Sequence, residues 1–419
     1  MKTETKRRCR RVFIVDAKRS AIGKFLGSLY EADPAGVCAQ VIRKGFASLQ
    51  DKLQEVESVI IGNVISAGTG QGTARKISIL SGIPESTPAY SVNMVCGSGM
   101  QAIRNGMNEI EGGADLVLCG GFEFMSNIPY ATSSYIRLGK KFGDFTMMDL
   151  MTHDGLTDAL SGVHMGITAE NIAKKYDISR NRQDEYAYMA LQRAISAVDS
   201  GKFADEIVSV SLQDYRGRAY TFDTDEFPNR SSSMEKLQSL KPTFIKDGSG
   251  TITAGNSSGI NDGCAFLLLA SQEYCIQNHL TPLAEIRESA AVGCDPQFMG
   301  LGPYYAIKKL LEKAGLEFEK VDCFEINEAF AAQALGCYHL LSEEYGVPVE
   351  AIIKKCNRYG SGLGLGHPLG ATGARITTTL AHMLKNEQKQ YGVASLCIGG
   401  GMGTAVLLER VEENEFFKG

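Results

Sequence analysis

The sequence predicts an α/β protein built from two similar halves of βαβαβ type, with a loop-rich subdomain inserted into the first half. The first third of the 419 residues alternates short apolar segments with amphipathic ones, which is typical of a buried, mainly parallel sheet covered by helices. The last third resumes this alternation, and a segment rich in Met, Tyr, Ser and charged residues separates the two. We therefore expect an N-terminal half at 1–121 plus 249–275, an inserted subdomain at 122–248 and a C-terminal half at 276–419.

The elements of the first half follow from the spacing of its apolar residues. Near-continuous apolar runs indicate buried strands, and apolar residues three and four apart indicate helices. The expected strands are 12–15, 56–64, 92–95 and 115–119, the last ending in a turn at Gly120 and Gly121. The expected helices run from Pro34, a residue suited to a first helical turn, through Leu53, and from the glycines after Cys96 to about Glu111.

The inserted subdomain contains one clear helical pattern, for which Ser179 is a suitable N-cap. A second helix start is indicated at 164–171, with Thr168 as its cap. The apolar face of the first helix consists of Ala187, Ala190, Leu191, Ala194 and Val198.

An internal repeat relates the two halves. A Pro-initiated helix followed by a strand ending in Asn occurs at 34–63 and again at 303–327. A glycine-rich loop, a helix and a strand ending in Cys and a glycine pair occur at 96–121 and again at 370–400. The same order of elements in both halves indicates a duplication.

Composition and charge exclude several classes of protein. The net charge of −5 argues against nucleic acid as the main partner, and no apolar run reaches the 18 or more residues of a membrane span. The cysteines number 11, an odd count, with no C-x-x-C pair, which argues against a disulfide framework and a zinc site. A basic leader at 1–11 precedes an apolar run too short for a signal peptide, so we expect a cytoplasmic protein without bound metal.

Cys96 is the first candidate for chemistry. It lies where a strand gives way to a helix and is followed by Gly97 and Gly99. The free N–H groups and positive dipole end of a helix N-terminus lower a thiol pKa, and the glycines allow close approach of a ligand. The alternative interpretation is a cysteine packed at a strand–helix junction.

His367 lies in a loop that contains six glycines in the 14 residues 360–373. Such a loop suits close approach by another group, and a nucleophilic thiol needs a base such as histidine. A structural histidine in a tight turn is the alternative.

Cys397 is a second candidate thiol, since its strand ends in a glycine-rich turn whose N–H groups can bind an oxyanion. A buried cysteine before a turn is the alternative, and the local pattern alone favours it. Asn327, at the end of another strand, either caps the following helix or holds a water or a carbonyl group.

Together these motifs resemble the thiolases, and most closely the short-chain, biosynthetic-type acetyl-CoA acetyltransferases. They run in family order from about Val12 to Leu408. The motifs are Val95-Cys-Gly-Ser-Gly99, His164-Met-Gly-Ile-Thr-Ala-Glu-Asn171, Thr253-Ala-Gly-Asn-Ser-Ser-Gly-Ile-Asn-Asp-Gly263, Asn327-Glu-Ala-Phe-Ala331, Gly366-His-Pro368 with Gly370 and Gly373, and Cys397-Ile-Gly-Gly-Gly-Met-Gly403.

The resemblance implies the layered α/β/α/β/α thiolase fold and a two-step Claisen chemistry. Cys96 would carry the acyl group, His367 would take its proton, and Cys397 would remove an α-proton from a second acetyl-CoA. His367 and a water held by Asn327 would stabilise the enolate, and the N–H groups of Cys96 and Gly399 would stabilise the tetrahedral intermediate. Acetyl-CoA, acetoacetyl-CoA and CoA are the implied ligands, with no tightly bound cofactor, and a homotetramer is the implied assembly.

The resemblance also implies a coenzyme A site against the inserted subdomain. Ser258 is the expected pantetheine contact, and Met165 is bulky enough to indicate a short acyl group. Arg230 is the candidate for the adenine end. The other expected pocket residues are Leu156, His164, Phe244, Met299 and Phe330.

Three residues depart from the family pattern. Tyr359 replaces an asparagine near the catalytic histidine, and Phe122 and Phe124 replace small or polar residues. A degradative 3-ketoacyl-CoA thiolase of broader chain length is the alternative within the family. An inactive thiolase-like protein that binds acyl-CoA or lipid is the alternative outside enzymes, although both thiols and His367 are retained. A ketoacyl synthase is disfavoured because such enzymes use one cysteine and two histidines.

Overall fold

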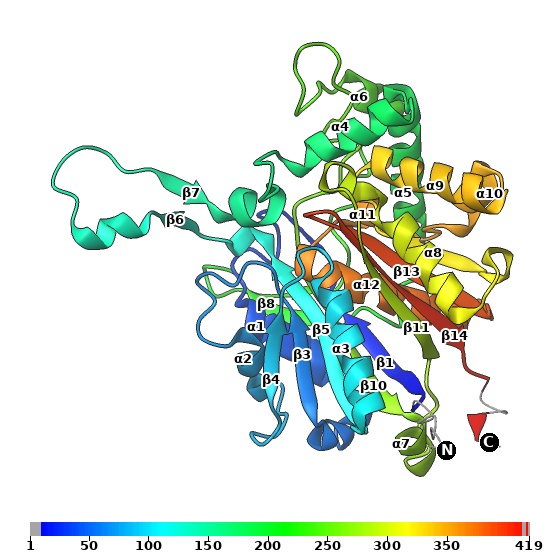
Figure 1. The fold of residues 1–419 in the computed structure, drawn as a ribbon. Coiled ribbons are helices and arrows are strands. Elements are labelled where there is room, and N and C mark those ends of the chain that lie inside the picture. The colour runs from blue at the N-terminus through cyan, green and yellow to red at the C-terminus, as the bar shows by residue number, and fades with distance from the viewer. Residues whose placement is uncertain (1–9, 413–415, 418–419) are drawn as a thin grey trace, which may run out of the picture.

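One sheet runs through the molecule (Figure 1). The structure is a computed structural model that describes residues 10–412 and 416–417, so most of the expected basic leader lies outside the described residues. The strands of the sheet are β1 (Val12–Arg19), β2 (Gly23–Lys24), β3 (Ser58–Gly62), β4 (Ala89–Val92), β5 (Leu116–Phe124), β10 (Asn261–Ser271), β11 (Ala284–Gly293), β12 (Cys323–Ile326), β13 (Tyr391–Ile398) and β14 (Met402–Arg410). They follow the order β12-β13-β14-β11-β1-β10-β5-β3-β4, with β2 beside β10.

The duplication predicted from the sequence is visible in this order. From the centre outward, the first half runs β1, β10, β5, β3, β4, with two antiparallel pairings followed by two parallel ones. The second half runs β11, β14, β13, β12 with the same directions, and a parallel bridge between Phe324 and Cys356 stands in the place of β4. The two halves meet where β1 pairs with β11 over three residues.

Helices cover the outer faces of both halves and fill the space between them. In the first half, α1 and α2 pack on one face and α3 on the other. In the second half, α8 packs on the outer face, while α12 contacts strands of both halves. The helices are α1 (Pro34–Gly45), α2 (Thr73–Leu80), α3 (Ser98–Gly112), α7 (Gln272–Gln277), α8 (Gly302–Ala314), α9 (Ala331–Tyr345), α10 (Val349–Lys355), α11 (Gly362–Leu365) and α12 (Leu369–Asn386).

The alternation of side-chain direction along the strands explains the layers of the fold. In β3, Ile60 faces the central core shared with α3 and α12, whereas Val59 and Ile61 face the outer core of the first half. In β14, Val406 faces the central core and Leu407 the outer core of the second half. Strands with two buried faces are apolar at most positions, as the sequence indicated, and the result is the α/β/α/β/α arrangement.

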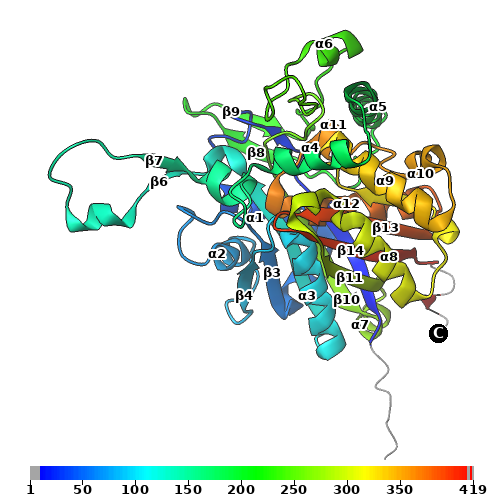
Figure 2. The ribbon, with the colours of Figure 1, turned by 45° about the horizontal axis from the view of Figure 1, so that its top comes forward.

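The segment between β5 and β10 forms an arm and a helical cap (Figure 2). The arm leaves the body through two short strands and extends away from it in both ribbon views. The elements of this segment are β6 (Tyr130–Thr132), β7 (Met147–Asp149), a π-helical turn at Met151–Leu156, α4 (Met165–Lys175), α5 (Arg180–Asp199), β8 (Val210–Gln213), β9 (Ala219–Phe222) and α6 (Met234–Ser239). Within the described residues, no helix has the length and apolar character needed to cross a membrane.

Three local predictions were wrong for identifiable reasons. The first helix ends at Gly45 rather than Leu53, because Phe46 leaves helical geometry and two 3-10 turns follow. Gly120 and Gly121 are not a turn but lie inside β5, where a Cβ would come within 2.2 Å of Ala265 O and 2.1 Å of Gly370 O, respectively. These glycines therefore serve close backbone approach.

The cap of α4 is also not the predicted residue. His164 is the N-cap, since its Nδ1 accepts from Gly166 N at 3.0 Å, and Thr168 lies inside the helix with its hydroxyl donating to Met165 O. The predicted cap of α5 is confirmed, because Ser179 Oγ accepts from Arg182 N.

Candidate active site

A cavity of about 250 Å³ lies where the two halves meet the inserted segment. Eleven of the thirteen residues expected from the sequence line it. They are Cys96, Leu156, His164, Met165, Phe244, Ser258, Met299, Phe330, His367, Cys397 and Gly399. Asn327 lies immediately behind His367, and Arg230 lies elsewhere.

Cys96 occupies a strained turn between β4 and α3. The residue before it, Val95, has φ of 46°, a left-handed conformation that is unfavourable for a β-branched side chain. The turn is held by Val95 N, which donates to Asn93 Oδ1 at 2.9 Å, and by Val95 O, which accepts from Ser98 Oγ at 2.6 Å. Backbone strain of this kind concentrates at functional sites.

Glycines bring the second half against this turn. A Cβ on Gly97 would lie 2.4 Å from Ile398 Cδ1, and a Cβ on Gly99 would lie 2.7 Å from Gly370 O. The end of β13 and the start of α12 therefore approach Cys96 directly, and with them come Cys397 and His367.

The protonation of Cys96 differs from the sequence prediction. Burial raises the pKa of the Cys96 thiol to about 11, although the N–H groups of Gly399 and of Cys96 itself lower it by donating to the sulfur. Desolvation at the base of the cavity thus outweighs the helix terminus. Cys96 is a thiol at neutral pH, so the prediction of a lowered pKa was wrong and a base is required.

His367 lines the same cavity as Cys96 and is the candidate base. Burial and, to a smaller extent, the charge of Arg375 together lower its pKa to about 3, so the imidazole is neutral and able to accept a proton. Its Nδ1 lies 2.7 Å from Thr372 Oγ1, and its backbone N–H donates to Asn261 Oδ1 at 3.0 Å. These contacts fix the ring at the start of α12.

Asn327 approaches His367 from the end of β12. Its Nδ2 lies 3.4 Å from His367 Nε2 and 3.5 Å from Nδ1, and its Oδ1 is buried with no hydrogen-bond partner among the described residues. The residue does not cap α9, whose N-cap is Phe330. A buried amide oxygen without a protein donor is suited to holding a water.

The two thiols belong to different apolar clusters. Cys96 packs with Leu369, Leu156 and Ile260 in a cluster that continues toward the arm. Cys397 packs with Met165, Met299 and Phe330. Burial raises the pKa of Cys397 well above its usual value, and Cys96 raises it further. Each thiol therefore packs against a different set of apolar side chains, although both line the same cavity.

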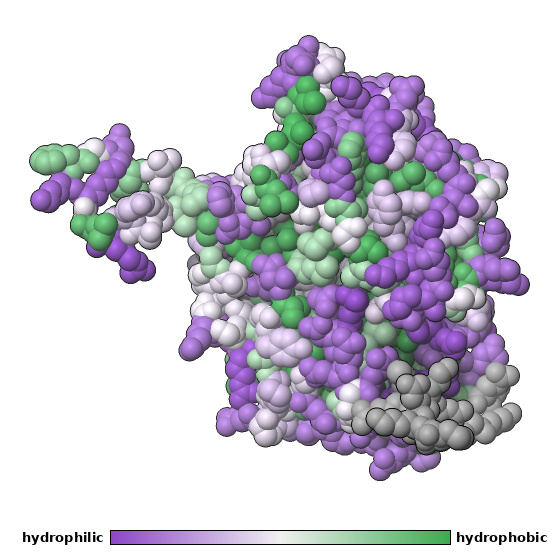
Figure 3. Space-filling model, viewed as in Figure 1, coloured by the Kyte–Doolittle hydropathy of each residue, from purple (hydrophilic) through white to green (hydrophobic). Residues whose placement is uncertain are grey.

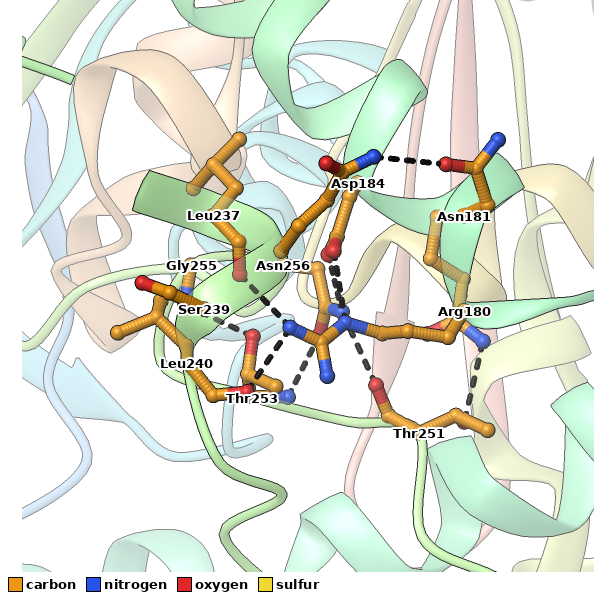
Figure 4. Close-up of polar contacts among 12 residues, drawn as sticks. Arg180, Asn181, Asp184, Leu237, Ser239, Leu240, Thr251, Thr253, Gly255 and Asn256 are labelled. Atoms are coloured by element: carbon orange, nitrogen blue, oxygen red, sulfur yellow. Dashed lines mark hydrogen bonds and ion pairs between the residues drawn. The ribbon is translucent and has the colours of Figure 1, made fainter. Parts of the chain in front are cut away.

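A polar network fixes the turn that carries Ser258 (Figure 4). Asn256 Nδ2 donates to Asp184 Oδ1 at 2.9 Å, and its Oδ1 accepts from Thr253 N at 2.8 Å. Arg180 binds Asp184 Oδ2 at 2.7 Å and also the carbonyl of Leu237. The network ties α5 and α6 to the 253–259 turn, and Ser258 N donates to Ala329 O at 2.9 Å.

A second cavity, of about 510 Å³, adjoins the first through Ser257. It is lined by residues of α5, α6 and the 227–232 segment, among them Asn229. Arg230 lines neither cavity, because its guanidinium pairs with Asp199 at 2.6 Å on the surface.

The three departures from the family pattern serve packing. Phe122 and Phe124 face the outer core of the first half, with ring centroids 6.5 Å apart. Between them, Glu123 points the other way and accepts from Asn63 Nδ2 and Gly370 N. Tyr359 packs on Phe203 and donates to Glu387 Oε1 at 2.6 Å. None of the three aromatic residues lines the catalytic cavity.

Sequence reasoning missed several residues of the cavity. Leu369 could have been inferred from its position two residues after His367. Ile260 lies within the 253–263 motif, in which only Ser258 was assigned a contact. Gly155 lies in a segment without a distinctive local pattern, and Met125 follows a strand that was expected to end earlier.

Comparison with known proteins places the chain in a family. Residues 12–273 match the family description "Thiolase, N-terminal domain", and residues 280–410 match "Thiolase, C-terminal domain". The acetyl-CoA acetyltransferase of Chromobacterium violaceum is 45% identical over 400 residues, covering 95% of this chain and 99% of that protein.

Comparison with solved structures gives the same family. The chain superposes on Bacillus anthracis acetyl-CoA acetyltransferase with a TM-score of 0.90 at 40% identity, covering 96% of this chain and 99% of that one. Human mitochondrial 3-ketoacyl-CoA thiolase in complex with CoA gives a TM-score of 0.89 at 39% identity, again covering 96% and 99%. The chain therefore belongs to the thiolase family.

Proposed function

We propose that the protein is an acetyl-CoA C-acetyltransferase, which condenses two acetyl-CoA molecules to acetoacetyl-CoA and CoA and catalyses the reverse thiolysis. The observation that supports this best is the convergence of Cys96, Cys397 and the neutral His367 on one cavity. Cys96 has two N–H donors directed at its sulfur, whereas Cys397 packs in a separate apolar cluster. This asymmetry suits one nucleophile and one base.

In the first step, Cys96 attacks the carbonyl carbon of acetyl-CoA while His367 accepts the thiol proton. The tetrahedral oxyanion is stabilised by the N–H groups of Cys96 and Gly399, which already point at the sulfur. Such a donor contributes about 3–4 kcal/mol. His367 returns the proton to the departing CoA thiolate, leaving acetyl-Cys96.

In the second step, Cys397 first gives its thiol proton to the neutral His367 in the same cavity, and the resulting thiolate removes an α-proton from a second acetyl-CoA. The enolate oxygen is stabilised by the protonated His367 and by a water held at Asn327, whose buried Oδ1 has no donor among the described residues. The enolate carbon attacks acetyl-Cys96, and acetoacetyl-CoA forms as the Cys96 sulfur leaves and takes the proton from His367, which restores both thiols and the neutral imidazole.

The CoA portion would extend from the catalytic cavity into its neighbour. Ser258 would contact the pantetheine, between Phe244 and Phe330. The adenosine end would occupy the second cavity beside Asn229. Arg230 would reach it only by leaving Asp199.

The proposed assembly is a homotetramer formed through the arm. The arm carries strongly exposed apolar side chains, including Leu138 at 81% and Phe142 at 91% exposure, and hydrophobic residues gather along it in the space-filling view (Figure 3). Exposed apolar surface of this kind marks an interaction site. Cytoplasmic location is supported by the ten free cysteines of the described chain, since a reducing compartment keeps thiols free.

Thiolysis kinetics test the proposal. We expect turnover of acetoacetyl-CoA with CoA, with kcat/KM falling for 3-ketoacyl-CoA substrates of six or more carbons. A rise toward longer chains would instead identify a degradative 3-ketoacyl-CoA thiolase. If acetoacetyl-CoA binds but is not cleaved, the protein is an acyl-CoA-binding member of the family.

A further inference from the structure

We propose that Thr372 is a positioning residue that sets the tautomer of His367, with the proton on Nδ1 and the lone pair on Nε2. Thr372 lies in the first turn of α12 and is fully buried. Its Oγ1 is 2.7 Å from His367 Nδ1 and 2.8 Å from Pro368 O. The hydroxyl therefore has two close polar neighbours but a single proton to give.

The position of that proton follows from the carbonyl. Pro368 O can only accept, and two oxygens 2.8 Å apart are repulsive unless a proton lies between them. The Thr372 hydroxyl consequently donates to Pro368 O, and only its lone pair faces the ring. His367 Nδ1 must supply the hydrogen of the second bond.

Asn327 does not decide between the two tautomers. Its Nδ2 lies 3.4 Å from His367 Nε2 and 3.5 Å from His367 Nδ1, so it faces both ring nitrogens about equally. The tautomer is therefore set by Thr372, and because the neutral ring carries one proton, the lone pair is on Nε2.

The catalytic consequence of this tautomer rests on the proposed function, in which His367 accepts the proton of Cys96. With Nδ1–H fixed on Thr372, Nε2 takes the proton without a ring flip or tautomer exchange, and Thr372 Oγ1 then stabilises the imidazolium through Nδ1–H. Without the hydroxyl, Nδ1–H has no partner in a buried site, which favours the tautomer whose Nε2 is already protonated.

A matched control lies five residues further along α12. The hydroxyl of Thr377 donates to Gly373 O at 2.7 Å and is equally buried. Like the hydroxyl of Thr372, it donates to the carbonyl four residues earlier in the chain, which is here called a back-bond. No histidine is among its hydrogen-bond partners in the described chain. Thr377→Val therefore reproduces the loss of the back-bond alone, and Thr372→Ser retains the hydroxyl.

The test combines ¹⁵N histidine NMR with alkylation of Cys96 by iodoacetamide, using the full-length protein. His367, assigned through His367→Gln, is expected to show a protonated Nδ1 and an unprotonated Nε2 in wild type, Thr372→Ser and Thr377→Val. Thr372→Val should lose this signature and alkylate at least tenfold more slowly at pH 7, with the pH profile displaced. Thr372→Ala is the substitute if the valine variant does not fold.

Two results would overturn the proposal. One is a protonated Nε2 in the wild-type spectrum. The other is wild-type alkylation and an unchanged ¹⁵N signature in Thr372→Val or Thr372→Ala. Neither depends on turnover, whereas failure of the wild type to cleave acetoacetyl-CoA would count against the proposed function alone.

Discussion

The backbone N–H of Gly399 donates to the sulfur of Cys96. Cys96 precedes α3 in the first half, and Gly399 follows β13 in the second, so neither half contains the complete site. Gly97 permits this contact, because a side chain there would collide with Ile398. Duplication has thus placed a helix start from one half against a strand end from the other.

Removal of the second thiol should separate the two half-reactions. Cys397→Ala is expected to form acetyl-Cys96 from acetyl-CoA but to lose condensation by about 10²–10⁴-fold, the range for a general base. Isotope exchange between acetyl-CoA and free CoA measures the first step, and acetoacetyl-CoA formation measures both. Cys119, which is buried in the corresponding strand β5 of the first half, provides the control, and Cys119→Ala should leave the ratio of the two rates unchanged.

Asn327→Ala should affect the enolate step more than acylation. Its buried Oδ1 has no protein donor, and loss of the water that we assign there would remove one oxyanion donor. The expected loss in condensation is about 10²–10³-fold, with acetyl-Cys96 formation reduced less than tenfold. Equal losses in both steps would assign Asn327 to the placement of His367 instead.

Met165→Ala should broaden chain-length specificity. Met165 lines the cavity and packs beside Cys397, and its truncation makes room for additional methylenes, each worth about tenfold or more in discrimination. The ratio of kcat/KM for the six-carbon over the four-carbon 3-ketoacyl-CoA is expected to rise about tenfold. Met107→Ala, a buried change in α3 outside the cavity, should destabilise the fold without moving that ratio.

Glu325→Gln should flatten the dependence of stability on pH. Burial raises the pKa of Glu325 to about 8, against the opposing charge of Arg375 at 3.8 Å. Among the described residues, neither carboxyl oxygen has a hydrogen-bond partner. Between about pH 4.3, where the unfolded glutamate titrates, and pH 8, the folded state holds the extra proton. The contribution of Glu325 to the free energy of unfolding is fully present below that range. Across the range it falls by about 1.4 kcal/mol per pH unit as pH rises.

Urea unfolding of wild type and Glu325→Gln between pH 6 and 8 measures this difference. The variant should show the shallower decline. The exposed glutamate Glu343 is the control, and Glu343→Gln should follow wild type. Parallel curves for wild type and Glu325→Gln would mean that Glu325 is already ionised in the folded protein at pH 6.

Charges on the arm should disrupt assembly. Leu138→Asp with Phe142→Asp places two carboxylates on its most exposed apolar side chains, and the expected result by sedimentation is loss of the tetramer with the fold retained. Leu160→Asp alters an apolar side chain that is 79% exposed and lies outside the arm, and it should leave the mass unchanged. A tetramer that persists in the arm variant would refute this assignment of the interface.

Local pattern identified the residues of the site where glycine and reactive side chains coincide, as at Cys96, His367 and Cys397. It misread Gly120 and Gly121, because a glycine that admits another backbone looks the same in sequence as a turn glycine. The close neighbours are distant in the sequence, since Ala265 O of β10 lies against Gly120 and Gly370 O of α12 lies against Gly121. Contacts between segments that are distant in the sequence therefore limit what a local pattern can predict.

Protonation could not be predicted from local pattern either. The helix start after Cys96 indicated a lowered thiol pKa, yet burial by residues from both halves raises it. Thr372 was part of a recognised motif, but its role depends on two distances that no spacing encodes.

The most direct test of the account is the location of the acyl group. Incubation with acetyl-CoA, acid quenching and peptide mass analysis should place a single acetyl group on the peptide that contains Cys96. Cys397→Ala should retain it, and Cys96→Ala should lose it. Acetylation of Cys397 in the wild type, or no acetylated cysteine at all, would contradict the assignment of Cys96 as the nucleophile.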